Sequence, residues 1–228
     1  DQGIDVLHCE EIMENIVRIA IDGPSGAGKS TIAKTVADKL DMEYVDTGAM
    51  YRAVGYKMSK ENVNPESLDE VCRVLAETKI DFDKGAIYLD GEDVGDKIRT
   101  SEMSRVASIY SALPPVREKL LVIQREIGHR KSVVMDGRDI GTNVFKDAQH
   151  KFFLTATAEE RANRRFLELK NKGEDVSYDK ILQDIEARDY NDINRKLNPL
   201  RKAEDAIEID STDMTVDQVA DFILDKVK

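Results

Sequence analysis

A glycine-rich stretch near the N-terminus constrains this chain more than any other feature. Residues 23–31 read Gly-Pro-Ser-Gly-Ala-Gly-Lys-Ser-Thr and match the pattern G-x-x-x-x-G-K-S/T. An apolar run at 17–21 precedes the motif and is typical of a buried strand. Apolar residues three to four apart follow it at 32–40 and predict a helix. This context indicates a phosphate-binding P-loop rather than a glycine-rich turn with an unrelated lysine.

The residue types of the loop suit phosphate chemistry. Glycines let successive backbone N–H groups point at phosphate oxygens, and the following helix adds the positive end of its dipole. We expect Lys29 to reach the β- and γ-phosphates and the Ser30 hydroxyl to ligate Mg²⁺. The loop therefore predicts binding of a nucleoside triphosphate, with contacts from Gly23, Ser25, Gly26, Ala27, Gly28, Lys29, Ser30 and Thr31.

Composition narrows the class of protein. A chain of 228 residues can bury a good core as one domain. Its net charge of −11 disfavours a nucleic-acid polymer as partner. Two distant cysteines predict neither a disulfide nor a zinc framework, and no stretch is apolar over a membrane-spanning length. We expect a cytoplasmic protein. Residues 1–12 do not resemble the rest of the chain. Two interpretations stay open: they are a non-native or upstream extension before a start at Met13, or they form an ordinary N-terminal helix.

The order of predicted elements indicates an α/β fold. Strands at 17–21, 43–45, 132–136, 151–154 and 206–210 alternate with helical patterns, which predicts a parallel sheet covered on both faces. Capping boxes predict helix starts at Ser67 with Glu70, Thr157 with Glu160, and Thr215 with Gln218. Residues 80–99 break the alternation. Two short strands at 80–83 and 86–89, with turn signals after each, predict a small antiparallel β insertion.

Polar motifs follow the predicted strand ends, where open α/β sheets bind ligands. Residues 46–52 read Asp-Thr-Gly-Ala-Met-Tyr-Arg and open a helix. Asp136 ends a buried strand, and such an aspartate holds Mg²⁺ in P-loop proteins. Residues 137–142 (Gly-Arg-Asp-Ile-Gly-Thr) predict close backbone approach to a bound group, and a sharp turn with a solvated Arg-Asp pair is the simpler alternative.

Arginines recur at helical spacing further along the chain. Arg161, Arg164 and Arg165 fall at i, i+3 and i+4, so we expect them to share one face and to suit phosphoryl charge. Arg188, Asp192 and Arg195 form a second stripe. An exposed basic face and a surface ion pair are the simpler alternatives. The polar residues 170–175, which include Gly173, are typical of a short lid.

At this point the chain resembles the bacterial-type cytidylate kinases, a branch of the nucleoside monophosphate kinases. The resemblance runs from about Met13 to the C-terminus and rests on residues 21–30, 46–52, 136–142 and 188–195. It implies a three-layer P-loop fold over 13–228 with a parallel central sheet. It also implies a monophosphate-binding region at 47–106, which contains the β insertion at about 80–99, and a short lid at about 162–176.

The resemblance also implies the reaction and the residue roles. ATP and CMP (or dCMP) would give ADP and CDP (or dCDP) with Mg²⁺ held near Ser30 and Asp136. We also expect a monomer whose partners are these small nucleotides, with neither a nucleic-acid polymer nor a membrane. Thr47, where the family often has Ser, would line the monophosphate site with Tyr51 and Arg52. Ser108, Arg117 and Asp139 would read the cytosine edge, and Arg188 and Asp192 would contact the sugar. Arg138 would hold the acceptor phosphate, and Arg161, Arg165 and Arg195 would belong to the lid and the transfer site. The implied catalytic residues are Lys29, Arg138, Arg161, Arg165, Arg188 and Arg195.

Three other functions stay open. One is another small-molecule kinase with UMP, AMP or shikimate as acceptor. The second is a GTP-binding switch, because Thr78-Lys79-Ile80-Asp81 matches a guanine-reading N/T-K-x-D pattern, although the chain has no D-x-x-G. The third is an ATPase linked to nucleic acid, which the negative charge disfavours.

Overall fold

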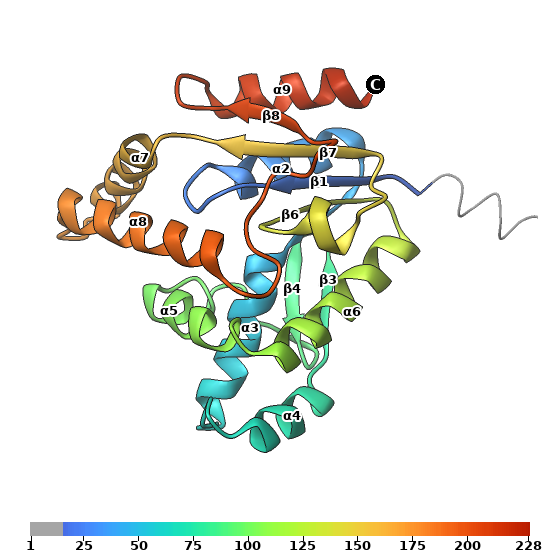
Figure 1. The fold of residues 1–228 in the computed structure, drawn as a ribbon, viewed down its shortest axis with the longest axis vertical. Helices are drawn as coiled ribbons and strands as arrows, with labels where there is room; N and C mark the ends of the chain where they lie inside the picture. The colour runs from blue at the N-terminus through green and yellow to red at the C-terminus, as the bar shows by residue number, and fades with distance from the viewer. Residues whose placement is uncertain (1–15) are drawn as a thin grey trace, which may run out of the picture.

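A five-stranded parallel sheet forms the centre of the computed structural model, which describes residues 16–228 (Figure 1). The strand order is β2-β6-β1-β7-β8, with every neighbouring pair parallel. The predicted parallel sheet is therefore confirmed, whereas the alternatives for residues 1–12 and the start at Met13 lie outside the described residues. The strands are β1 (Arg18–Asp22), β2 (Glu43–Asp46), β6 (Val133–Gly137), β7 (His150–Thr155) and β8 (Ile207–Asp210).

Helices cover both faces of this sheet and give the predicted three layers. In β1, Ile19 and Ile21 pack into one apolar cluster with α2 and α9, whereas Ala20 faces a second cluster with α3 and α6. Because successive side chains of a strand point to opposite faces of the sheet, the chain builds two apolar cores, one on each face (Figure 1). The helices are α2 (Lys29–Leu40), α3 (Thr47–Lys60), α4 (Leu68–Glu77), α5 (Ser101–Tyr110), α6 (Pro114–Arg130), α7 (Ala158–Asn171), α8 (Tyr178–Asn194) and α9 (Val216–Val227).

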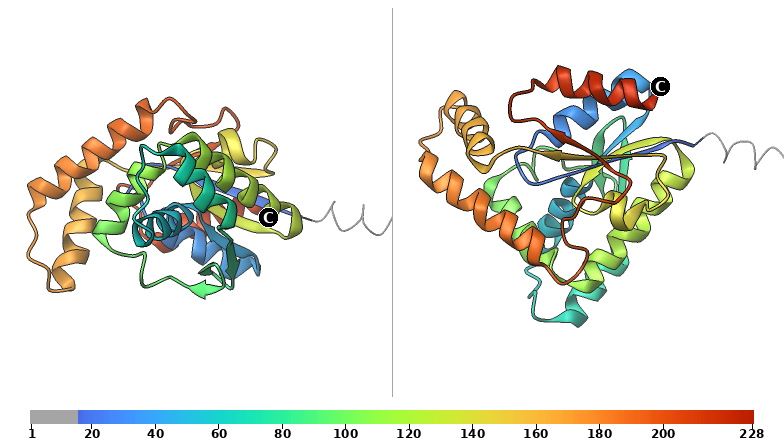
Figure 2. Two further views of the ribbon diagram at one scale, coloured as in Figure 1. Left: turned by 90° about the horizontal axis from the view of Figure 1, so that it is seen from below. Right: turned by 45° about the horizontal axis from the view of Figure 1, so that its top comes forward.

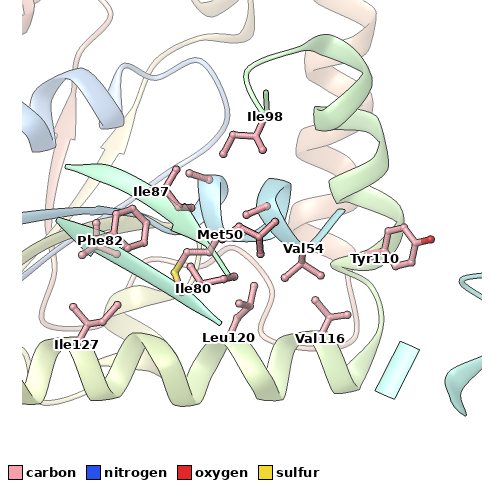
Figure 3. Packing of buried hydrophobic residues seen from close by; sticks show 14 of the residues in the cluster. Met50, Val54, Ile80, Phe82, Ile87, Ile98, Tyr110, Val116, Leu120 and Ile127 are labelled. Atoms are coloured by element: carbon pink, nitrogen blue, oxygen red, sulfur yellow. The ribbon is translucent and has the colours of Figure 1, made fainter. Parts of the chain in front are cut away.

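The predicted antiparallel insertion is present and has a third, short strand. Strands β3 (Ile80–Asp83), β4 (Ala86–Leu89) and β5 (Glu92–Asp93) form their own sheet. Lys84 and Gly85 both have positive φ, as the tight turn between β3 and β4 requires. Ile80 and Phe82 are buried, and Figure 3 shows them beside Met50 of α3 and residues of α6. The insertion is thereby packed into the core beneath the main sheet.

Two of the three predicted capping boxes differ in detail. Thr215 and Gln218 form the complete box. Thr157 accepts from the N–H of Glu160, but the Glu160 carboxylate pairs with Arg164 instead of returning to the cap.

The box at Ser67 is wrong, because the Ser67 side chain caps nothing. The Glu70 carboxylate instead accepts from the backbone N–H of Asn64, at 3.3 Å. The Asn64 side chain accepts from the N–H of Glu66, so a local turn before the helix provides the carboxylate with another partner.

Helices α7 and α8 lie side by side at one end of the molecule, joined by a turn at Gly173, whose φ is +80° (Figure 2). The interval 162–176, which the sequence predicts as a lid, covers most of α7 and this turn. Within residues 16–228, no helix combines the length and apolar character needed to cross a membrane.

Candidate active site

The P-loop connects β1 to α2 in the geometry that the motif predicts. Gly28 caps α2 with a φ of +87°, which favours glycine. A Cβ on Gly23 would lie 2.2 Å from the carbonyl oxygen of Leu154, so only glycine fits between the loop and β7. The loop lines a cavity of about 240 Å³, with walls formed by Ser25, Gly26, Gly28, Lys29, Ser30, Thr31, Asp46, Gly48, Arg52, Asp136, Gly137, Arg138 and Arg188.

Lys29 is buried in this loop, and its Nζ donates to the carbonyl of Pro24 at 2.7 Å. Burial and the nearby Arg138 guanidinium lower the pKa of Lys29, because both disfavour a further positive charge. The hydrogen bond to Pro24 holds the amino group of Lys29 in place, and among the described residues no carboxylate is bonded directly to it. Lys29 can therefore bind an anionic ligand.

Asp136 ends β6 beside the P-loop serine. The Ser30 hydroxyl donates to Asp136 Oδ2 at 3.2 Å, and the Tyr44 hydroxyl donates to Oδ1 at 2.9 Å. Burial, and then the neighbouring Asp46, raise the pKa of Asp136 because both penalise its negative charge. A cation at this carboxylate would relieve that penalty.

An adjacent hydroxyl and carboxylate fit Mg²⁺, which prefers oxygen ligands and commonly binds through one or two protein groups plus substrate phosphates. Among the described residues, no group of three or more His, Cys, Asp or Glu side chains could hold a metal on its own. Ser30 and Asp136 are thus the residues that fit Mg²⁺ at the P-loop.

A second cavity adjoins the P-loop cavity at the carboxyl edge of the sheet. It is lined by all nine side chains that the resemblance assigns to the acceptor, drawn from α3, α5, α6, the β6 end and α8: Thr47, Tyr51, Arg52, Ser108, Arg117, Arg138, Asp139, Arg188 and Asp192. Arg195 also lines it. The two cavities share Gly48, Arg52, Gly137, Arg138 and Arg188, so they meet along one wall.

Asp139 and Arg117 form the buried end of the acceptor cavity. Arg117 donates to Asp139 Oδ2 at 3.3 Å, and its guanidinium lies 5.5 Å from the centre of the Tyr51 ring. Arg195 reaches the other carboxylate oxygen at 3.5 Å. The Ser108 hydroxyl lies on α5 and donates to the carbonyl of Ser104 at 3.2 Å. The cavity thus combines donors and an acceptor beside an aromatic ring.

Arginines surround the wall between the two cavities. Arg138 donates to Asp192 at 2.8 Å, and Arg52 donates to Asp46 at 3.0 Å. Burial opposes ionisation of Asp192, but Arg138 holds the pKa of Asp192 below its usual value. Within residues 16–228, the Arg188 guanidinium has neither a hydrogen bond nor an ion pair. The guanidinium groups at this wall can therefore bind phosphate groups through charge-assisted hydrogen bonds.

Of the three arginines predicted to share a face of α7, only Arg161 reaches the P-loop. It is buried, donates to the carbonyl of Ser25 at 3.0 Å and forms an ion pair with Asp189 of α8. Arg164 donates instead to the carbonyl of Ser211, and Arg165 pairs with Glu168 on the exposed surface.

The three residues do lie along one side of α7, because positions i, i+3 and i+4 of an α-helix fall within about 100° of one another. Their long side chains nevertheless end at different partners. The structure does not bring Arg165 to the two cavities.

Sequence reasoning missed three side chains that shape the site. Tyr44 bonds to Asp136, Asn143 bonds to Asp139, and Asp22 accepts from the backbone N–H groups of Ile140 and Gly141. These last two residues begin a π-helical turn, Ile140–Val144, which follows Asp139 directly. The position of Asp22 just before the P-loop was the one available signal. The glycine-flanked segment after β6 is thus a buried, anchored turn rather than a solvated one.

Comparison with known proteins agrees with this geometry. The model of the cytidylate kinase family matches residues 19–228. The chain is 52% identical over 213 residues to a cytidylate kinase of Caldicellulosiruptor saccharolyticus, with 92% of this chain and 94% of that protein covered. It is 49% identical over 215 residues to a cytidylate kinase of Clostridioides difficile strain 630, with 94% and 99% covered.

A solved structure of an uncharacterized protein from Eubacterium ventriosum superposes with a TM-score of 0.50 at 16% identity, covering 92% of this chain and 98% of that one, and shows likeness of fold alone. The family match extends over nearly the whole chain, and the relatives share about half of its residues. The chain therefore belongs to the cytidylate kinase family.

Proposed function

We propose that this protein transfers the γ-phosphoryl group of ATP to CMP or dCMP, giving ADP and CDP or dCDP. The observation that carries the proposal is the shared wall of the two cavities. All nine candidate acceptor residues line one cavity, and Arg138 and Arg188 also line the P-loop cavity. Two nucleotides bound there would meet with their phosphates together, as direct transfer requires. The names of the relatives support cytidylate as the acceptor.

On the donor side, the P-loop N–H groups and Lys29 would bind the ATP phosphates. Ser30 and Asp136 would hold Mg²⁺, which would offset phosphate charge when bound. Arg161, the residue just before the lid proposed at 162–176, is tied both to the carbonyl of Ser25 and to α8, so the base of the lid is held beside the P-loop. Closure of that lid would exclude water from the phosphates and would be needed to bring Arg165 toward them.

On the acceptor side, the arrangement matches the groups of cytidylate. Arg52, Arg138 and Arg188 suit its phosphate, and Asp192 suits a sugar hydroxyl. Asp139 would accept from the exocyclic amino group of cytosine, while Arg117 would donate to the ring acceptors. Thr47, Tyr51 and Ser108 would complete the walls of this monophosphate-binding region, proposed to span 47–106. The acceptor phosphate is itself anionic, so the reaction needs no general base, and none of the three histidines lies in a site motif.

The proposal has three further parts, which are separate from the chemistry. The partners are the small nucleotides, the protein works as a monomer in the cytoplasm, and nucleic acid is not a substrate. The guanine-switch alternative has no support, because the Thr78 hydroxyl is buried and donates to the carbonyl of Val74 at 2.7 Å. A base-reading threonine would present its hydroxyl to a ligand.

The test is turnover with ATP and Mg²⁺ on CMP, dCMP, UMP, AMP, GMP and shikimate measured side by side. We expect CMP and dCMP to have the highest kcat/KM. Faster turnover of any other acceptor would reject the cytidylate assignment, and tight GTP binding with no acceptor turnover would favour the switch. Stimulation of ATP hydrolysis by DNA or RNA would favour the nucleic-acid-linked ATPase.

A further inference from the structure

Asn143 lies directly behind the carboxylate that faces the acceptor base. Its Nδ2 donates to Asp139 Oδ2 at 3.0 Å, and Arg117 donates to the same oxygen at 3.3 Å. Among residues 16–228, the other oxygen, Oδ1, has only the long contact of 3.5 Å with Arg195. The two carboxylate oxygens therefore have different environments: one is occupied by two donors and the other is largely free to accept from a ligand.

The backbone of Asn143 is fixed beside Asp139. The Asn143 N–H donates to the carbonyl of Asp139 at 2.9 Å, within the π-helical turn. Arg125 of α6 donates to the carbonyls of Asn143 and Val144 at 2.9 and 3.2 Å. These contacts fix the point from which the Asn143 side chain extends, and the hydrogen bond to Oδ2 then orients its amide.

A third cavity lies against Asp139 and offers space into which its side chain could turn. It has a volume of about 200 Å³, lies against Asp139 and Arg117 on the side of α6, and is lined also by Gln124 and Asn143. Packing alone therefore does not confine the carboxylate. The Asn143 amide and the Arg117 guanidinium are the groups that fix its orientation toward the acceptor.

Orientation of this carboxylate decides which pyrimidine fits. Cytosine presents an amino donor where uracil presents a carbonyl acceptor. A fixed carboxylate oxygen accepts from the amino group of cytosine but repels the carbonyl of uracil. A carboxylate free to turn away would lose the first interaction and relieve the second.

We propose that Asn143 is a positioning residue that sets the preference for cytosine over uracil, by holding one oxygen of Asp139 so that the other faces the base. This inference rests on the proposed function, and it assigns to Asn143 a role in specificity rather than in phosphoryl transfer.

The experiment compares wild type with Asn143→Leu, which removes the donor at similar volume, and Asn143→Asp, which replaces the donor by a repelling oxygen. We expect kcat/KM for CMP to fall about tenfold to a hundredfold in Asn143→Leu, as for the loss of one hydrogen bond to a charged group, and further in Asn143→Asp. The kcat/KM for UMP should stay level or rise, and KM for ATP should not change. Calorimetric titration of CMP without ATP should show the same loss of affinity.

Lys146→Met is the matched control, because Lys146 is exposed near the end of the same segment and its side chain makes no contact with Asp139. We expect it to keep the wild-type ratio of CMP to UMP. An unchanged ratio of kcat/KM for CMP to kcat/KM for UMP in Asn143→Leu, whether or not both values fall, would overturn the inference. A wild type that does not prefer CMP to UMP would instead overturn the proposed function, so the two failures are distinguishable.

Discussion

The Asp22 carboxylate accepts a hydrogen bond of 2.8 Å from the backbone N–H of Gly141, and its second oxygen accepts one of the same length from Ile140. The last residue of β1 thereby anchors the turn that follows Arg138 and Asp139. The contact joins the strand that leads into the P-loop to the segment that lines the acceptor cavity. Burial raises the pKa of Asp22 to about 6, although the two backbone bonds oppose that rise.

This pKa predicts how Asp22 changes stability with pH. The folded state binds the proton more tightly than the unfolded chain, whose aspartate has a pKa near 3.8. The stabilising contribution of Asp22 is therefore complete below pH 3.8 and is lost as pH rises through about 6, a change of about 3 kcal/mol. Urea unfolding of wild type and Asp22→Asn at pH 4, 5, 6 and 7 measures this, because other groups titrate alike in both proteins. We expect the stability of wild type relative to the variant to decline over this range; a difference independent of pH would contradict the prediction.

Lys29→Ala should lower kcat by about 10²–10³, the cost of removing one preorganised charge from a phosphoryl-transfer site. The fold should persist, since Lys29 bonds only to the carbonyl of Pro24 within its own loop. Steady-state kinetics and circular dichroism check both expectations. Lys34→Ala, an exposed lysine on the same helix, is the control. Unchanged turnover in Lys29→Ala would remove the P-loop lysine from the mechanism.

Arg188→Met should lower kcat/KM for CMP by about 10²-fold with little loss of stability. Within the described part of the chain its guanidinium has no partner to leave unsatisfied, and it lines both nucleotide cavities. Activity and thermal unfolding are measured together, with Lys180→Met at the exposed start of α8 as control. A large loss of stability with normal kinetics would indicate a structural role.

Tyr44→Phe should weaken binding of metal-bound ATP about tenfold or more, because it removes the hydroxyl that orients Asp136. Affinity for ATP without metal should not change. Water-proton relaxation with Mn²⁺ measures the first quantity, and equilibrium dialysis of ATP in the presence of a chelator measures the second. Equal weakening of both would show that Tyr44 supports the loop as a whole rather than the carboxylate.

The parallel sheet, the succession of strands and helices along the chain and the β insertion could be predicted from the sequence because their signals are local. The order of the strands within the sheet came only from the structure. Apolar spacing identifies each element, and the glycines of the P-loop identify the turn. The scattered acceptor residues are different. Ser108, Arg117 and Asp139 come together only through the tertiary fold, and only the family resemblance pointed to them.

The failures share one physical cause. Ser67 does not cap its helix and Arg165 turns away from the site, because each carboxylate nearby has a choice of partners that helical spacing does not determine. Tyr44 and Asn143 were missed for the converse reason. Each supports another polar side chain across the fold, and such pairing leaves no periodic trace in the sequence.

The wall shared by the P-loop cavity and the cavity beside it has a pharmacological consequence if the proposed function holds. A single molecule with adenosine at one end, cytidine at the other and a chain of phosphates between them would fill both cavities at once. The linked molecule would lose translational freedom once rather than twice on binding. Its affinity for the protein should therefore exceed that of either nucleotide alone. The best length of its phosphate chain would measure, in solution, how far apart the two nucleosides sit.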